Sequence, residues 1–141
     1  MAEYSNAALQ TVTENGDVLF SEAPIPCTRG FIIHRDGSGI FKLRGITNQN
    51  RARYRVTFGA NIGIPTGGTA GAISLAISVD GEAIPGTIMT VTPAAVEEFF
   101  NVSRTVNIDI PAGCCGTVSV KNISDQSIDV VNANIVIDRV A

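Results

Sequence analysis

A strict alternation of apolar and polar residues runs through Arg53-Tyr54-Arg55-Val56-Thr57-Phe58-Gly59-Ala60-Asn61-Ile62. The even positions are apolar or small, and the odd positions are polar or glycine. Successive side chains of a β-strand point to opposite faces, so this stretch predicts a strand with one face in a core and the other in water. This stretch decides the fold class, because no long segment of the chain shows helical spacing instead.

The same period of two recurs on the C-terminal side of that stretch. The apolar rows are Ile73, Leu75, Ile77 and Val79; Val106, Ile108 and Ile110; Val118 and Val120; and Val131, Ala133, Ile135 and Ile137. The dipeptides Asn15-Gly16, Asp36-Gly37 and Asp80-Gly81 favour tight turns, since these residues tolerate positive φ. Short strands at even spacing predict an all-β sandwich or barrel. We expect an N-terminal arm at residues 1–13 and one antiparallel β-sandwich domain at residues 14–141.

Two connections are predicted less simply. The longest is Gly63-Ile64-Pro65-Thr66-Gly67-Gly68-Thr69-Ala70-Gly71, whose four glycines predict an exposed and flexible tip. Pro93-Ala94-Ala95-Val96-Glu97-Glu98-Phe99-Phe100 is compatible with a helical turn or with a bend into another strand, and both interpretations stay open.

Composition points to a covered surface. The 141 residues suffice for one domain with a sizeable core. Charged residues make up 16%, against roughly 25% in typical soluble domains. Mean hydropathy is +0.24, yet no apolar run approaches the roughly 18 residues of a membrane span. We therefore expect contact with other copies or other proteins, the alternative being a sandwich with a large core.

The first residues, Met1-Ala2-Glu3-Tyr4, show no basic leader and no apolar core of a signal peptide. This predicts synthesis in a host cytoplasm, with no signal peptide, no transmembrane segment and no membrane partner.

Basic residues are concentrated in residues 29–55, where only Asp36 opposes them. This basic segment contains Arg29, Arg35, Lys42, Arg44, Arg51, Arg53 and Arg55. Such polarity can orient a subunit against a complementary surface, so the segment and residues 1–13 are the candidate docking surface. The alternative is a solvated strand face. No aromatic residues alternate with the basic ones as in a nucleic-acid platform, so no nucleic-acid partner is expected.

Catalytic groups are scarce. The single histidine, His34, lies at a predicted strand end and fits a structural role; one histidine cannot build a cupin metal site. Glu97 and Glu98 are adjacent, so in a strand they would point to opposite faces and could not share acid–base work. The glycine loop at 67–71 lacks the lysine of a phosphate-binding loop. We therefore predict no catalytic residues, no cofactor and a non-enzymatic protein.

The three cysteines are Cys27, Cys114 and Cys115. Together with His34 they show no zinc-finger spacing, so no metal site is predicted. Cys114 and Cys115 are neighbours whose side chains would diverge in a strand. The odd count permits an intersubunit disulfide or a pair with Cys27, while cytoplasmic synthesis favours reduced, buried thiols.

From Tyr54 onward the chain resembles the TNF/C1q-like jelly roll found at the C-terminus of bacterial collagen-like surface proteins. The features that carry this are the strand at residues 53–62, the strand at 73–79 with its Asp80-Gly81 turn, and the closing Val131-Asn132-Ala133-Asn134-Ile135-Val136-Ile137. The resemblance implies a jelly-roll β-sandwich with a central last strand and a three-fold interface, so a homotrimer is expected.

The whole chain also resembles short structural proteins encoded in prophages of gut Firmicutes. Met1-Ala2-Glu3-Tyr4-Ser5, Arg44-Gly45-Ile46-Thr47-Asn48-Gln49 and Val91-Thr92-Pro93-Ala94-Ala95-Val96-Glu97-Glu98 carry this resemblance. It implies a bacteriophage virion component that decorates or stabilises the capsid and contacts the major capsid protein or another virion protein. The alternative function is a receptor- or glycan-binding head of a phage fibre or bacterial surface protein, with the loop at 63–71 as its specificity element.

Overall fold

The computed structural model describes residues 1–140, which form an antiparallel β-sandwich with one short 3-10 helix and no α-helix. Its elements are β1 (Ala2–Asn6), β2 (Gln10–Val12), β3 (Glu22–Ile25), β4 (Ile32–His34), β5 (Phe41–Arg44), β6 (Arg51–Gly63), β7 (Ile73–Val79), β8 (Glu82–Ala83), η1 (Pro85–Thr87), β9 (Met89–Val91), β10 (Phe100–Pro111), β11 (Cys115–Asn122) and β12 (Ile128–Arg139).

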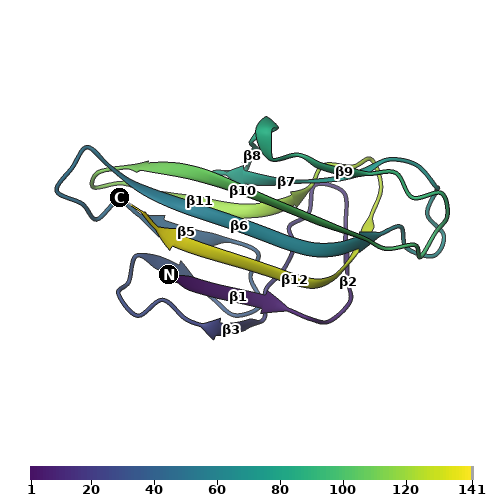
Figure 1. Cartoon of the computed structure of the whole chain (residues 1–141), viewed down its shortest axis with the longest axis horizontal. Helices are drawn as coiled ribbons and strands as arrows, with labels where there is room; N and C mark the ends of the chain where they lie inside the picture. The colour runs from purple at the N-terminus through teal and green to yellow at the C-terminus, as the bar shows by residue number, and fades with distance from the viewer. Residues whose placement is uncertain (141) are drawn as a thin grey trace.

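The strands form two sheets that pack face to face (Figure 1). The first sheet has the order β10-β6-β12-β1-β3, with β2 added to β12. The second has the order β4-β5-β11-β7-β8, with β9 added to β7. Strand β12 lies between β6 and β1, so the last strand occupies the middle of the first sheet. The predicted all-β sandwich is confirmed.

The alternation at residues 53–62 works as predicted. Tyr54, Val56, Phe58, Ala60 and Ile62 are all at most 2% exposed, and they face the second sheet. The aromatic ring of Phe20 bridges the layers, with its centroid 5.3 Å from that of Phe41 and 6.3 Å from that of Phe58. One continuous apolar core therefore joins the two sheets.

The expected inward row of the last strand is wrong at one position. Val131 is half-buried on the outer side, whereas Ile128 and Val130 are fully buried. The pairing register between β12 and β6 shifts between Val131 and Asn134, and Asn132 has a φ of 55°. This β-bulge reverses the alternation, so Ala133, Ile135 and Ile137 point inward only after it.

The N-terminal segment is not a separate arm. Strand β1 pairs along β12 from Ala2↔Ile137 to Asn6↔Ala133, and β2 pairs with β12 at Ile128↔Val12. Figure 1 accordingly shows the two chain ends at the same end of the sandwich. Ala2 and Tyr4 are buried, so β1 completes the core. The sequence missed this because five residues carry too little periodicity to identify a strand.

The predicted turns form, and the long glycine loop is tied down. Asp80 and Gly81 both have positive φ, 52° and 87°, as a tight hairpin turn requires.

In the loop after β6, the Thr69 amide donates to Gln126 Oε1 at 3.0 Å and Gln126 Nε2 donates to Thr69 O at 2.8 Å. Residues 93–99 contain no helix, and β10 begins at Phe100.

Candidate assembly face and basic end

The side of the first sheet that faces away from the core carries mostly small, polar and charged side chains, and we call it the assembly face. It consists of Arg51, Arg53, Arg55, Thr57, Gly59 and Asn61 from β6; Asn101, Ser103, Thr105, Asn107 and Asp109 from β10; Val131, Asn134, Val136 and Asp138 from β12; and Glu3 and Ser5 from β1. Most of these positions follow from the period of two, because they alternate with buried neighbours on the same strand.

Hydrogen bonds between neighbouring strands order this surface. The hydroxyls of Thr57 and Thr105 lie 3.1 Å apart, and Asn101 Nδ2 donates to Asn61 Oδ1 at 3.2 Å. Asn134 Nδ2 donates to Glu3 Oε2 at 2.6 Å. Because these side chains are held to one another across the strands, little rotamer entropy remains to be lost when a partner covers them.

Gly59 lies at the middle of the assembly face. It pairs with Ser103 on β10 and with Asn134 on β12. Because Gly59 has no side chain, the surface between the side chains of Ser103 and Asn134 is low at this position. Another surface could therefore approach the backbone closely at this point.

Charge on the assembly face is confined mainly to one end. Asp109 accepts from Arg53 Nε at 2.8 Å and Nη2 at 3.2 Å, and its other contact is Arg51 Nε at 3.1 Å. The hydrogen bond from Arg53 lowers the pKa of Asp109; desolvation opposes this in part, and the charges of Arg53 and Arg51 add to the lowering. Sequence reasoning missed Asp109, although its place in the row of polar odd positions from 101 to 109 was a usable signal.

The outer side of the second sheet is different, because the chain itself covers part of it. The pattern predicts that Ala76 and Ser78 face water, yet both are fully buried. The neighbouring η1 holds Thr87, whose hydroxyl accepts from the Ile77 amide at 2.9 Å and lies 2.7 Å from Ile84 O. Part of the outer side of the second sheet is therefore covered by the chain itself.

The structure does not bring the predicted basic segment together as one patch. Arg51, Arg53 and Arg55 lie on the assembly face, while Lys42 and Arg44 alternate with buried residues on the second sheet and point outward there. Arg35 lies in the turn after β4, and Arg29 lies in the loop before it. Two opposite sheets share the segment because β5 and β6 follow one another but belong to different layers.

Several loops meet at one end of the sandwich, which we call the basic end. It comprises the loops at residues 26–31, 45–50 and 112–114 and the end of β12. Arg44 Nη1 donates to Gly30 O at 3.4 Å, and the Gly45 amide donates to Cys114 O at 2.8 Å. Arg139 lies over the ring of Phe31, 4.6 Å from its centroid, and belongs to the same end.

The three cysteines are free thiols. Cys114 and Cys115 are exposed, which corrects the expectation of buried thiols at these positions, because they sit where the β10–β11 turn leads outward into β11. Cys27 is half-buried. Burial raises its pKa, but the amides of Arg29, Ile32, Phe31 and Gly30 outweigh that effect, so the pKa of the Cys27 thiol is lowered.

His34 is placed by packing. Its ring stacks on Phe41 with centroids 4.3 Å apart, and its Nε2 lies 2.8 Å from Ser38 O.

Glu97 accepts a hydrogen bond from Thr66, and Glu98 is exposed. Within residues 1–140 no three His, Cys, Asp or Glu side chains gather as metal ligands would. The same residues include no helix with the length and apolarity to cross a membrane.

Comparison with known proteins shows the fold. The chain is similar to a solved Eiger TNF from S. frugiperda, with a TM-score of 0.68 and 11% identity over 99% of this chain and 91% of that one. It is also similar to the globular domain of zebrafish complement 1qA, with a TM-score of 0.57 and 9% identity over 94% and 93% of the two chains. No family model and no curated protein matches. The chain therefore has a TNF/C1q-like jelly-roll fold.

Proposed function

We propose that this chain is a non-enzymatic assembly module that forms a homotrimer through its assembly face. The observation that carries the proposal is the uncovered outer side of the first sheet, centred on Gly59. Ser103, Thr57 and Thr105 surround that glycine with short side chains, so another copy can approach closely. Paired charges lie mainly toward the edge, where they can remain hydrated while the centre is buried.

We further propose that the trimer serves in a bacteriophage virion as a capsid decoration or stabilising protein. The low charged fraction of 16% supports a surface that works in contact with other proteins. Icosahedral lattices offer three-fold positions, where a trimer can match the local symmetry. The basic end and the exposed Arg35 and Lys42 are the candidate contacts to the major capsid protein or another virion protein.

The assembly face can be tested by placing one bulky charge at its centre. A β-carbon built on Gly59 meets only ordinary contacts, with Val102 O at 3.8 Å and Ser103 Cβ at 3.9 Å, so Gly59→Arg should fold. We expect wild-type protein to have a mass of about three times 14.8 kDa by light scattering, and Gly59→Arg to have the mass of one chain.

The matched control is Gly86→Arg, which adds the same side chain to η1 on the second sheet, where no atom lies within 4 Å. It should leave the mass unchanged. A monomeric wild-type protein at tens of micromolar, or a Gly59→Arg protein that remains trimeric, would contradict assembly through this face.

The virion role needs a separate test. Purified particles of the encoding phage should contain the chain in mass spectrometry, and a cryo-EM map should show its density on the capsid. Particles whose capsid map lacks that density, or purified virions without the chain, would exclude the decoration role while leaving the trimer untouched.

A receptor- or glycan-binding head remains the second candidate function, and the loop end opposite the basic end favours it. A cavity of about 460 Å³ lies there between residues 69–72 and Asp125 and Gln126. The two Thr69–Gln126 hydrogen bonds fix this loop, as a preformed binding site requires. Saturable binding of one glycan on an array, lost in the Gln126→Ala variant, would favour this function over the capsid role.

A further inference from the structure

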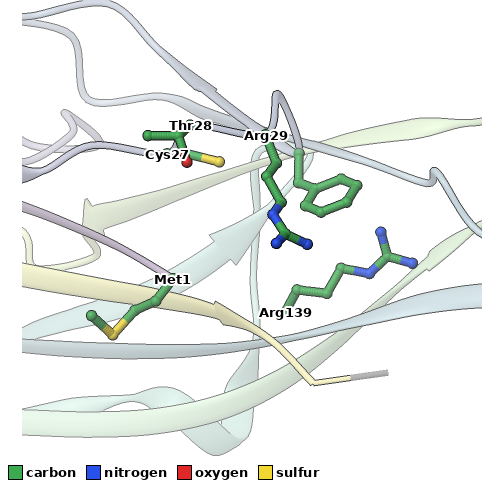
Figure 2. Close-up of a pocket in the computed structure, with 6 residues that line it drawn as sticks. Met1, Cys27, Thr28, Arg29 and Arg139 are labelled. Carbon is green, nitrogen blue, oxygen red and sulfur yellow. The ribbon is translucent and has the colours of Figure 1, made fainter.

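A second candidate site lies at the basic end, next to the charged end of the assembly face but lined by other residues. A cavity of about 440 Å³ opens between the loop at residues 26–31, the end of β12 and the first residue. Its lining residues are Met1, Cys27, Thr28, Arg29, Phe31 and Arg139. Figure 2 shows the side chains of Arg29 and Arg139 entering this space from opposite sides, with the loop and the strand each supplying one guanidinium group.

The charge of this cavity is one-sided. Two of its six lining residues are arginines, and within residues 1–140 none of its lining residues is acidic. Guanidinium groups stay charged at any physiological pH. An anion placed between Arg29 and Arg139 can accept charge-assisted hydrogen bonds from both.

One of the two arginines is held in position by the fold. The guanidinium carbon of Arg139 lies 4.6 Å from the centre of the Phe31 ring and 6.0 Å from the centre of the Tyr54 ring. Tyr54 OH in turn donates to Arg44 O at 2.5 Å. This cation–π contact restrains the position of the Arg139 guanidinium. Binding therefore has to order Arg29 far more than Arg139, because Arg29 is exposed.

The backbone of the same loop also favours negative charge. The amides of residues 29–32 act on Cys27, and together they lower the pKa of its thiol despite burial. Successive amides that converge on one point form an anion-binding concavity. The thiol of Cys27 thus reports on the local field, and it lies in the wall of the cavity that the two arginines enter.

We propose that this cavity binds a small anion through a phosphoryl or carboxylate group held between Arg29 and Arg139. Each of these groups can present a pair of oxygens that a guanidinium recognises bidentately. The site lies within one chain and uses no residue of the assembly face, so it does not depend on the proposed trimer.

Calorimetric titration with inorganic phosphate and with citrate, at an ionic strength kept constant with chloride, tests the proposal. We expect saturable binding of at least one of the two, weakened at least tenfold by Arg29→Gln. The matched control is Arg35→Gln, which removes the same charge from an exposed turn outside the cavity and should leave the dissociation constant within twofold. Absence of saturable binding of either anion, or equal weakening by both variants, would overturn the site.

A second readout uses Cys27 and does not rely on heat. In a Cys114→Ser/Cys115→Ser background, saturating anion should slow alkylation of Cys27 by neutral iodoacetamide at least threefold. Half-protection should fall at the calorimetric dissociation constant. If the anion leaves the rate of Cys27 alkylation unchanged while calorimetry detects binding, the ligand binds elsewhere and the assignment is refuted.

The Gly59→Arg variant separates this site from the assembly. If it is monomeric and still binds the anion with unchanged affinity, the site belongs to the single chain as proposed. Loss of binding on dissociation would show that a neighbouring copy completes the site, which contradicts the proposal but supports the trimer. Arg139→Lys, checked for an unchanged melting temperature, should weaken binding because an ammonium group cannot make the planar bidentate contact.

Discussion

Asp17 illustrates how a single side chain can act against stability. It lies in a short bridge to Lys121 beside β11, half-buried, and its Oδ1 is buried without a hydrogen-bond partner. Burial raises its pKa, and Lys121 and a hydrogen bond with Ser119 offset that rise only in part. The folded protein therefore binds the Asp17 proton more tightly than the unfolded chain does.

This predicts a pH dependence with a definite sign. The contribution of Asp17 to stability is greatest below the unfolded carboxyl pKa of about 4, and it is lost as the pH rises through the raised folded value. Asp17→Asn should remove this component, so the variant should gain relative to wild type as the pH increases, by less than about 1 kcal/mol because the site is half-exposed. Urea unfolding from pH 4 to 7 measures it, and parallel pH profiles of the two proteins would refute it.

At the scale of elements, one side chain replaces a backbone partner at the edge of the second sheet. On its outer edge β7 pairs with β8 at Ser78 and with β9 at Leu75, and between these two pairs the Ile77 amide has no strand opposite it on that edge. The buried Thr87 hydroxyl accepts from that amide at 2.9 Å, and it lies 2.7 Å from Ile84 O. The short η1 thus has a structural reason for its place.

Thr87→Val should therefore be destabilising although it preserves shape. The change leaves the Ile77 amide buried without an acceptor, which costs about 1–3 kcal/mol. Chemical denaturation should show this loss, and Thr87→Ser, which retains the hydroxyl, should recover most of it. Equal stability of the valine variant and wild type would show that water replaces the hydroxyl.

The element that sequence reasoning described best is β6, and the one it described least well is β1. Twelve residues of alternation, 51–62 in β6, leave one choice of inward face. β1 has five residues, and its identity as a strand comes from β12, whose paired residues lie 127 (Asn6↔Ala133) to 135 (Ala2↔Ile137) positions away. No local pattern contains that information.

At the scale of the whole molecule, the two ends of the chain close the first sheet together. Removal of residues 2–12 deletes β1 and β2 and exposes one edge of β12. It also removes the buried side chains of Ala2 and Tyr4, so the part of the core that they contact becomes exposed. We expect the truncated protein to lose its cooperative thermal transition or to aggregate through the free edge. Circular dichroism melting and light scattering measure both.

The control for this truncation is Leu9→Ser, which changes an exposed residue in the link between β1 and β2 and should leave the transition in place. A truncated protein that melts cooperatively at the wild-type temperature would restore the interpretation of residues 1–13 as a separable arm.

The sequence by itself determined the all-β class, the inward face of β6 and the tight turns, because these depend on neighbours within a few residues. Tertiary structure decided the rest. It divided the basic segment between two layers, paired Arg53 with Asp109 from a strand 56 positions away, and reversed the face of Val131 at a bulge. It also joined Arg29 to Arg139 around one cavity. Contacts between distant strands depend on register and topology, and the period of two is the same for every strand.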